Sequence, residues 1–314
     1  MKYFAKIMLK KTTSEGKAVA LVVSIVAVVL IVVVGVYYAI HTGAFTLRGT
    51  RYLAGSFQER ALYEVGLRGP KVIELPVAGK VIDYARANGH EAAITATLGA
   101  EDVYVLSGHT STAITKDGGI KSALAISSDG SMVAYAMRTA VANTGSSTTA
   151  FYAPSAWQIR VYDASTKEVR TFGNGYAPYF FTHDGQNYIA YSTENTLHIT
   201  NLKTNTSQDI PVSFGGNLVL HIAVFSNDGS YVALPDSGSG YALYALTYKN
   251  GLASISPVGP MPAATAAVAF DGSGIISLSQ SVSQSLLRSS NVTSPAQILK
   301  ARILPKSSIV KIIP

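Results

Sequence analysis

The chain has 314 residues, of which 48% are hydrophobic and 14% are charged, a composition that excludes a disordered chain. Cysteine is absent, which excludes a disulfide framework and a thiolate metal site. Of the formal net charge of +7, a share of +4 lies in residues 1–17, which hold five lysines and one glutamate. The near-neutral remainder argues against a nucleic-acid-binding surface.

A long apolar segment follows this basic leader: residues 18–40 contain no charged side chain. About 20 apolar residues in a helix span the ~30 Å hydrocarbon layer, so the sequence predicts a transmembrane helix over 18–40 with membrane lipid as its partner. Tyr37 and Tyr38 near its end suit the membrane interface. The lysines before the segment predict a single-pass membrane protein with a cytoplasmic N-terminus and an extracytoplasmic C-terminal domain, in a prokaryotic cell envelope.

Two alternatives exist for this N-terminal region. A cleaved signal peptide has an apolar region of about 7–15 residues and a small-x-small site, whereas this segment is longer and lacks such a site. Residues 10–29 resemble in outline the precursors of type IV pilins, which have a basic leader, a glycine cleavage site and a long apolar helix. That resemblance implies cleavage after Gly16 and a filament subunit, although Leu21 stands where many bacterial pilins have glutamate.

The rest of the chain repeats one pattern, a turn dipeptide followed by an alternating apolar run, as in SSDGSMVAYA at residues 127–136. Successive copies are 41 to 55 residues apart, and the longest interval holds a Ser-, Thr- and Ala-rich insertion at 139–156. Glycine after Asp or Asn favours a hairpin turn, because glycine adopts positive φ without steric strain. The predicted structural turns are Asn88, Asp129–Gly130, Asp184–Gly185, Asp228–Gly229 and Asp271–Gly272.

Each copy reads as four short strands, for example 123–127, 132–138, 157–163 and 168–172. A period near 43 residues with four strands is typical of a β-propeller blade, because stacked blades bury the faces that one small sheet cannot bury. The sequence therefore predicts an all-β propeller with five countable repeats and five to seven blades.

We expect the propeller domain to cover residues 81–314, preceded by a linker and possible ring-closing segment at 41–80. Four aromatic residues of the repeats are predicted to fill the spaces between blades. Replacement of one of them, Phe225, by alanine is expected to cost about 3–5 kcal/mol. The four are Tyr135, Tyr191, Phe225 and Phe270.

The repeats resemble a known family. The order S/T-x-D-G, an apolar run, I-x-V-Y-D and a closing R-T-F over about residues 80–303 is similar to the TolB-like, WD40-like propeller repeat. That family has W-S-P-D-G, whereas this chain has Ser128, His183 and Asn227 at the proline position and no tryptophan before the turn. The resemblance implies a propeller fold and says little about function.

No catalytic, cofactor-binding or metal-binding residue is predicted. The turn aspartates could in principle bind calcium or act as acids, but their repetition in most copies favours a role in capping their own turns. The histidines of the outer domain, at 90, 109, 183, 198 and 221, lack metal-site spacing, and no G-x-S-x-G sequence occurs.

One possible partner-binding patch stands beside the insertion. Phe151, Tyr152 and Trp157 are aromatic residues next to a Ser/Thr-rich loop, which is one way to build a contact surface. The alternative is that they pack inside the blades.

These features predict a membrane-anchored extracytoplasmic propeller without catalysis that acts as a protein-binding or scaffold module. Its expected partner is another protein or a cell-envelope component. The pilin-like filament subunit is the first alternative, and a glycan-acting hydrolase or lyase on a propeller is the second. The hydrolase would need carboxylates about 5–10 Å apart at the mouth of the propeller axis.

Overall fold

The computed structural model describes most of the chain, which forms two units, Met1–Thr46 and Leu47–Pro314. The described residues are 23–34, 47, 49–56, 59–66, 69–98, 100–139, 154–212, 223–236, 240–249, 252–262, 265–272, 274–280, 285–304 and 309–313.

The described part of the first unit is a helix over residues 23–34, whose side chains are all exposed. The remainder of the predicted span 18–40 and the predicted cleavage site at Gly16 lie outside the described residues. Within the described ranges, no helix has both the length and the apolar character needed to cross a bilayer.

In the second unit, five consecutive stretches each fold into a four-stranded antiparallel sheet, with the strands in chain order across the sheet. We number these sheets blades 2 to 6. The strands of blades 2 to 4 are β4 (Lys80–Ala87), β5 (His90–Thr97), β6 (Ala100–Ser107), β7 (Thr110–Ala113), β8 (Lys121–Ile126), β9 (Met132–Arg138), β10 (Trp157–Asp163), β11 (Glu168–Asn174), β12 (Tyr176–His183), β13 (Gln186–Ser192), β14 (Thr196–Asn201) and β15 (Ser207–Pro211). The strands of blades 5 and 6 are β16 (Val224–Phe225), β17 (Tyr231–Asp236), β18 (Gly240–Lys249), β19 (Leu252–Pro260), β20 (Thr265–Asp271), β21 (Gly274–Gln280), β22 (Ser285–Asn291) and β23 (Ser294–Leu304).

Blade 1 is assembled from both ends of the second unit. Its innermost strand, β24 (Ile309–Ile313), pairs antiparallel with β1 (Arg51–Ser56), and β2 (Glu59–Gly66) and β3 (Gly69–Ile73) follow outward. Only one residue pair, Arg60 with Val81, joins β2 to β4 of blade 2. The eight-stranded sheet formed by β24 and β1 to β7 is therefore two four-stranded blades that touch at this residue pair.

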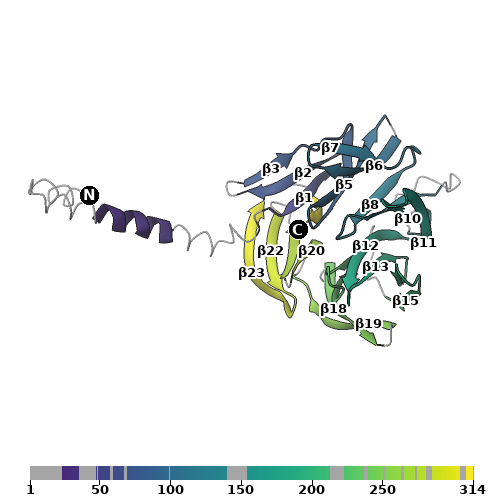
Figure 1. Cartoon of the computed structure of the whole chain (residues 1–314). Coiled ribbons are helices and arrows are strands. Elements are labelled where there is room, and N and C mark those ends of the chain that lie inside the picture. The colour runs from purple at the N-terminus through teal and green to yellow at the C-terminus, as the bar shows by residue number, and fades with distance from the viewer. Residues whose placement is uncertain are drawn as a thin grey trace, which may run out of the picture. The chain divides into compact units, whose positions relative to one another are not determined.

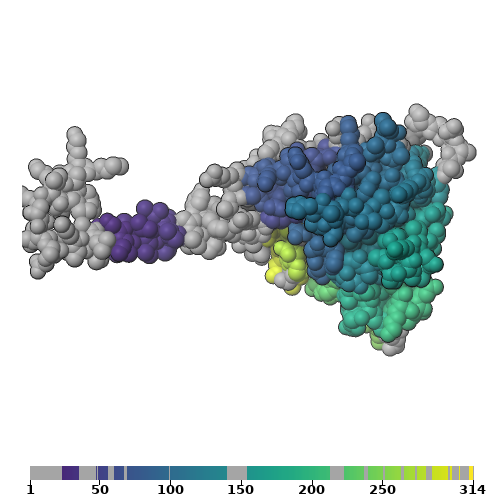
Figure 2. Space-filling model, turned by 45° about the horizontal axis from the view of Figure 1, so that its top comes forward, coloured from purple at the N-terminus to yellow at the C-terminus, as the bar shows by residue number. Residues whose placement is uncertain are grey.

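Among the described residues, six buried apolar clusters hold the blades together, one at each junction between neighbours, including the junction of blade 6 with blade 1. The sheets therefore close into a ring, as Figure 1 shows from β1 round to β23. In Figure 2 the blue, teal and green blades follow one another over one face. The described strands form a six-bladed β-propeller, which confirms the predicted fold and defines the blade number.

The strands of the second unit begin before the predicted domain boundary at residue 81. β1, β2 and β3 belong to blade 1, and the second unit begins at Leu47. Blade 1 does not show the repeat pattern because its first two strands come from opposite ends of the second unit and share no turn. Of the two roles predicted for 41–80, ring closure is the one found in the described part of that segment.

The predicted aromatic filling of the blade junctions is confirmed. Phe225 is 0% exposed between blades 4 and 5, where its ring stacks on Phe181 at 5.1 Å between centroids. Tyr135, Tyr191 and Phe270 are buried at the junctions of blades 2 and 3, 3 and 4, and 5 and 6.

The inner strands share a local irregularity near their first residues. In β4, β8, β12 and β20 the pairing register shifts by one residue relative to the next strand, which marks a β-bulge. Ala123 and Ala177, at two of these bulges, have φ of 52° and 54°. Such values are uncommon outside glycine and are frequent near functional sites.

Candidate binding site in the axial cavity

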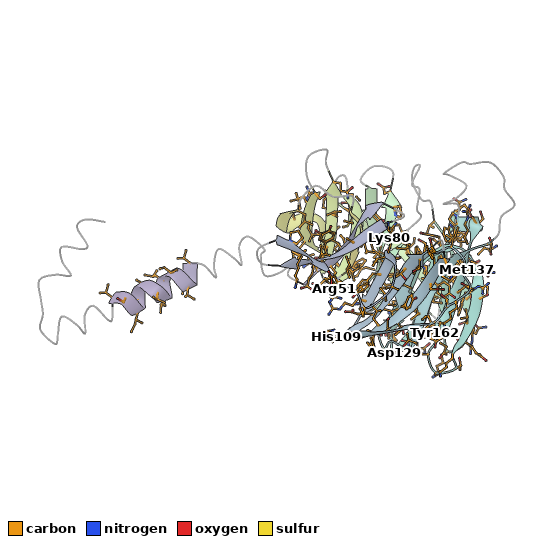
Figure 3. The ribbon with its side chains drawn as sticks, turned by 90° about the horizontal axis from the view of Figure 1, so that it is seen from above. Arg51, Lys80, His109, Asp129, Met137 and Tyr162 are labelled. Atoms are coloured by element: carbon orange, nitrogen blue, oxygen red, sulfur yellow. The ribbon has the colours of Figure 1, made fainter. Side chains whose placement is uncertain are left out.

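The predicted turn residues all lie at one end of the propeller, which we call the turn end. In each of blades 2 to 6 the turn dipeptide connects the innermost strand to the second strand. Because the strands are antiparallel, the connections between third and fourth strands lie at the same end, and the connections between blades lie at the opposite one. Figure 3 shows Asp129 and His109 at the turn end, and Lys80 and Met137 at the opposite end.

The turns of blades 3 and 5 have the same hydrogen-bond network. In blade 3, the Ser127 hydroxyl donates to the Asp129 carboxylate at 2.6 Å, and the Ser131 amide donates to the same oxygen at 3.0 Å. Ser226, Asp228 and Ser230 repeat these bonds at 2.6 and 3.0 Å. The aspartate therefore caps its own turn, as the sequence pattern favoured.

This network also sets the charge state of both aspartates. Partial burial tends to raise the pKa of Asp129, but the hydrogen bonds from Ser127 and Ser131 outweigh burial and leave the pKa below its ordinary value. The pKa of Asp228 is lowered in the same way by Ser226 and Ser230. Both carboxylates are thus committed to turn structure in their ionised form.

The turns of blades 2 and 4 are two-residue hairpins. Asn88 and Gly89 have φ of 46° and 85°, and Asp184 and Gly185 have φ of 48° and 70°. Two consecutive positive φ values are typical of a type I′ turn, which matches the twist of paired strands. In blade 6, Asp271 ends β20 and Gly272 follows with φ of 56°.

Trp157 does not belong to an exposed aromatic patch of the kind predicted beside the insertion. This side chain is 0% exposed and lies edge-on to Tyr176, at 5.3 Å between ring centroids, in the cluster between blades 3 and 4. Trp157 is therefore a packing residue and no part of a surface. Phe151 and Tyr152 lie outside the described residues.

A cavity of about 1270 Å³ runs along the propeller axis and is lined by the inner strands of all six blades. Three turn residues, Asn88, Asp228 and Asp271, line it at the turn end. Toward the opposite end the lining includes aromatic residues such as Tyr176 and also the cation Arg60. Polar groups therefore lie at both ends of the cavity.

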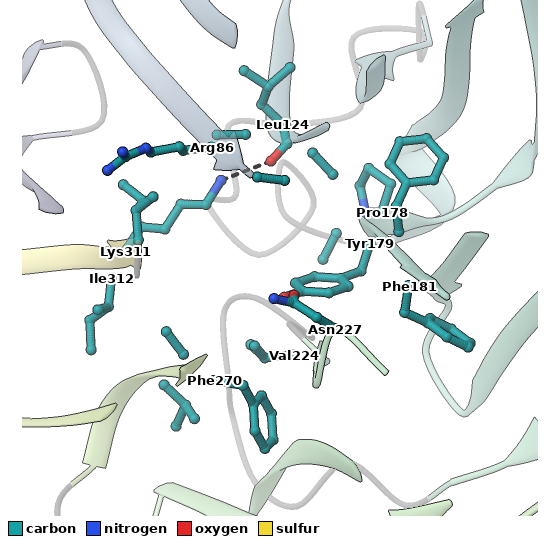
Figure 4. Close-up of a pocket in the computed structure, with 18 of the residues that line it drawn as sticks. Arg86, Leu124, Pro178, Tyr179, Phe181, Val224, Asn227, Phe270, Lys311 and Ile312 are labelled. Carbon is teal, nitrogen blue, oxygen red and sulfur yellow. Dashed lines mark hydrogen bonds between the residues drawn. The ribbon is translucent and has the colours of Figure 1, made fainter. Parts of the chain in front are cut away.

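One ion pair crosses the wall of this cavity and joins three blades. Lys311 on β24 donates to the Asp83 carboxylate at 3.0 Å and to the Leu124 carbonyl at 2.9 Å. Asp83 also accepts from the Leu124 amide at 2.8 Å and the Tyr84 amide at 2.7 Å. Figure 4 shows Lys311 reaching the bulged segment at Leu124. We call Lys311, Asp83 and Leu124 the closing latch, because it fixes the last strand to blades 2 and 3.

An aromatic side chain lies across the cavity from the latch. Tyr179 extends from β12 toward the middle of the cavity, beside Asn227 (Figure 4), whereas Phe270 of β20 is buried at the junction of blades 5 and 6. Burial raises the pKa of Tyr179 to about 12, so its phenol stays neutral at physiological pH. Arg86 of β4 lies on the latch side, with its Nε 3.6 Å from Glu91. A ligand in the cavity would meet two ion pairs, Lys311 with Asp83 and Arg86 with Glu91, on one side and the Tyr179 ring on the other.

These groups are suited to holding a ligand. Two of the cavity carboxylates are already engaged, Asp83 in the latch and Asp228 in its turn. Among the described residues, no group of three His, Asp or Glu side chains could hold a metal ion. The cavity therefore offers shape, aromatic surface and a few hydrogen-bonding groups.

Sequence analysis missed the latch and the cavity. Asp83 and Lys311 are 228 residues apart, and neither belongs to a motif. Ring closure alone brings them together, since Lys311 lies on the strand that completes blade 1. Lys311 could have been suspected as a single cation within the apolar run SSIVKIIP.

No protein-family model and no curated protein matches this sequence. Among solved structures, TolB from Acinetobacter baumannii superposes with a TM-score of 0.55 at 16% identity, over 88% of this chain and 68% of that chain. The fold is that of a TolB-like β-propeller. A chain of a nidogen/laminin complex shares it with a TM-score of 0.52 at 13% identity, over 84% and 98% of the two chains. A functionally unknown protein from Desulfotomaculum acetoxidans DSM 771 gives 0.51 at 10% identity, over 82% and 80%.

Proposed function

We propose that this TolB-like propeller is a membrane-tethered binding module whose axial cavity holds a segment of a partner protein. The observation that carries the proposal is the cavity itself, about 1270 Å³ in volume and bounded by all six inner strands. Pockets of roughly 300–1,000 Å³ already hold drug-sized ligands, so this cavity has room for several amino-acid residues. The likeness in fold to a chain of a nidogen/laminin complex supports protein binding as the activity.

The cavity wall favours a peptide over a compact polar metabolite. Tyr179 offers aromatic area for side chains of the segment, and aromatic residues dominate the binding energy of many protein interfaces. Arg86 and the exposed Asn227 offer polar contacts near the turn end. A segment with an acidic group near its tip and an apolar side chain behind it would match Arg86 and Tyr179.

A cavity-blocking variant tests this site. Ala266 lines the cavity and is exposed to it, so Ala266→Trp fills the space without entering a blade core. Ala164, exposed in the turn between β10 and β11, supplies the matched control Ala164→Trp. After mild detergent extraction and affinity isolation, we expect wild-type chain and control to recover the same partner and Ala266→Trp to recover it at least tenfold less. Equal recovery by all three would remove the cavity from the proposal.

The tether is the second part of the proposal, with segment 18–40 in the membrane and the propeller outside the cytoplasm. It is supported by the exposed apolar side chains of helix 23–34 and by the lysines that precede it. We expect the chain to resist alkaline carbonate extraction. Val28→Lys places a charge near the middle of the segment, at a penalty of about 2.5–3.5 kcal/mol, and should increase the extracted fraction. Full extraction of the wild-type chain would contradict the tether.

A filament subunit remains a second candidate, because exposed apolar side chains on a helix also suit the core of a fibre. The two candidates differ at the N-terminus, since filament assembly predicts removal of residues 1–16. The intact mass of the native chain separates them. A mature N-terminus at Lys17 would favour the filament, and a chain that begins at residue 1 or 2 would favour the tether.

A further inference from the structure

Two Asn-x-Ser/Thr tripeptides occur in the sequence, at Asn205-Thr206-Ser207 and Asn291-Val292-Thr293. With no proline at the middle position, this tripeptide is an acceptor site for N-linked glycans on exported proteins. Asn205 lies in the connection between β14 and β15, and Asn291 ends β22 before β23. The two asparagines are exposed, and both connections lie at the turn end.

The second tripeptide has its hydroxyl and its carboxamide in contact. Asn291 pairs with Ser294, so Val292 and Thr293 are the central residues of a tight turn. The Thr293 amide donates to Asn291 Oδ1 at 3.2 Å, and the Thr293 hydroxyl approaches the same oxygen at 3.3 Å. Val292 is buried among the residues between blades 5 and 6, which holds the turn in place. The carboxamide is thus oriented with its Nδ2 directed away from these two donors.

The first tripeptide lacks this arrangement although its turn is equally exposed. Asn205 has φ of 55°, and its amide donates to the Asn201 carbonyl at 2.9 Å. The Ser207 hydroxyl lies 2.9 Å from the Thr200 hydroxyl on the paired strand. The hydroxyl that completes the acceptor site therefore bonds across the hairpin instead of to its own asparagine.

We propose that Asn291 is an N-glycosylation site of the folded propeller. The co-reactant is a lipid-linked oligosaccharide, in which a phosphate or pyrophosphate oxygen is bonded to the anomeric carbon of the first sugar. Asn291 Nδ2 forms a bond to that carbon, the carbon–oxygen bond breaks and the phosphate leaves with the electron pair. One Nδ2 proton passes to a base of the transferring enzyme. No electron is exchanged, and an exposed, pre-oriented carboxamide is what such an enzyme would need in a folded substrate.

This inference rests on the proposed placement of the propeller outside the cytoplasm, where lipid-linked sugars are transferred to exported chains. The Asn291 side chain is exposed although its neighbour Val292 is buried, so a bulky polar glycan would extend away from the packed junction. Since Arg51 pairs with Ile313 at the end of β24, the chain enters the propeller at the turn end. The glycan and the point of entry would therefore share one end of the propeller.

The test uses the full-length chain isolated from the membranes of its natural source. Trypsin cleavage after Arg288 and Lys300 releases residues 289–300, which contain one asparagine, Asn291. We expect most of this peptide to carry a mass increment made of sugar units at Asn291, and the peptide that contains Asn205 to be at least tenfold less modified. Thr293→Val, which removes the hydroxyl at nearly constant volume, should abolish the increment, and Thr293→Ser should retain it.

Three outcomes would overturn the inference: an unmodified 289–300 peptide, equal modification of Asn205, or an increment that survives in Thr293→Val. Carbonate extraction and protease accessibility, measured on the same membranes, distinguish this failure from failure of the proposed function. A membrane-bound, externally accessible chain with bare Asn291 contradicts the glycan alone. A chain that is absent from the membrane contradicts the tether as well.

Discussion

Two junctions of the ring are held by different kinds of interaction. Between blades 4 and 5, aromatic rings stack in series, with Phe181 lying 5.1 Å from Phe225 and 5.2 Å from Tyr188. At the junction of blades 1 and 2, where the two ends of the second unit meet, ion pairs add to the apolar cluster: Arg51 binds Glu91 of blade 2 at 2.7 Å, and Lys311 binds Asp83.

The difference follows from connectivity. Continuous blades are held in place by short links, so non-directional apolar packing is enough to finish their junctions. The strand that closes blade 1 comes from the far end of the chain, and a β-strand shifted by one residue turns every side chain to the wrong face. Directional bonds from Lys311 and Arg51 to fixed partners in blade 2 select one register.

The largest expected effect comes from removing the closing strand. Deletion of residues 305–314 exposes blade 1 and removes two buried isoleucines, Ile312 and Ile313, each worth about 1.5–3 kcal/mol. Together with the lost ladder bonds at about 0.5–1.5 kcal/mol each, this approaches the whole stability of an ordinary domain. We expect the truncated chain to lose its cooperative thermal transition.

A peptide of residues 305–314 supplied in excess is the control, and it should restore part of that transition. A truncated chain that melts like the wild type would show that the ring does not depend on its last strand.

The second largest effect on stability is expected at the aromatic junction between blades 4 and 5. Phe225→Ala leaves a cavity among stacked rings and should lower the free energy of unfolding by about 3–5 kcal/mol. Urea denaturation measures this loss of unfolding free energy, and we expect the loss to be independent of salt concentration. The substitution Leu252→Ala, at an exposed position of β19, is the matched control and should change stability by less than about 0.5 kcal/mol.

The ionic junction gives a smaller effect. Asp83→Ala removes the acceptor of Lys311, Leu124 and Tyr84 at once and should cost about 2–4 kcal/mol. In a double-mutant cycle, Lys311→Met should add little once Asp83 is gone. Full additivity of the two substitutions would mean that the latch does not act as a unit.

The capped turns contribute less and depend on pH. Asp129→Asn weakens the turn bonds and should cost about 1 kcal/mol at pH 7. Because the pKa of Asp129 is lower in the folded chain, its contribution is present above the ordinary aspartate pKa and disappears as pH falls through the folded value. Unfolding measured from pH 7 down to pH 3 should therefore show the variant and the wild type converging, with Asp228→Asn behaving alike.

The smallest expected effect is a gain in thermal stability. Leu98 is fully exposed with φ of 50° in the connection between β5 and β6, a conformation that is unfavourable for leucine by about 1–2 kcal/mol. Leu98→Asn should raise the melting temperature slightly, because asparagine tolerates this region. Since the position lies on a continuous blade, ring closure should be unaffected.

The repeats made most of the fold predictable. Asp-Gly turns ahead of alternating strands gave five blades and the packing roles of Phe225 and Tyr135, because turn and strand signals are local. Blade 1 was not predictable in this way, since no turn links β24 to β1. The sequence did not decide whether Trp157 is exposed or buried, because an aromatic residue beside a polar loop is compatible with both.

The site was far less predictable than the fold. The cavity depends on inner strands of six blades meeting at one axis, and no local pattern encodes that meeting. The bulges at Ala123 and Ala177 place alanine where glycine would have given a signal. The latch pairs two charges that are close only after the ring has formed.

The closing strand also fixes the order of events during synthesis. Because β24 is the last strand of the ring in chain order, blade 1 can be completed only after the other five blades have been translated. Until then the other blades form an incomplete ring. The N-terminal segment has already been translated by that time. A partner peptide can therefore enter the cavity through the gap between blades 6 and 2 before β24 pairs with β1. It need not pass through either end of the propeller axis.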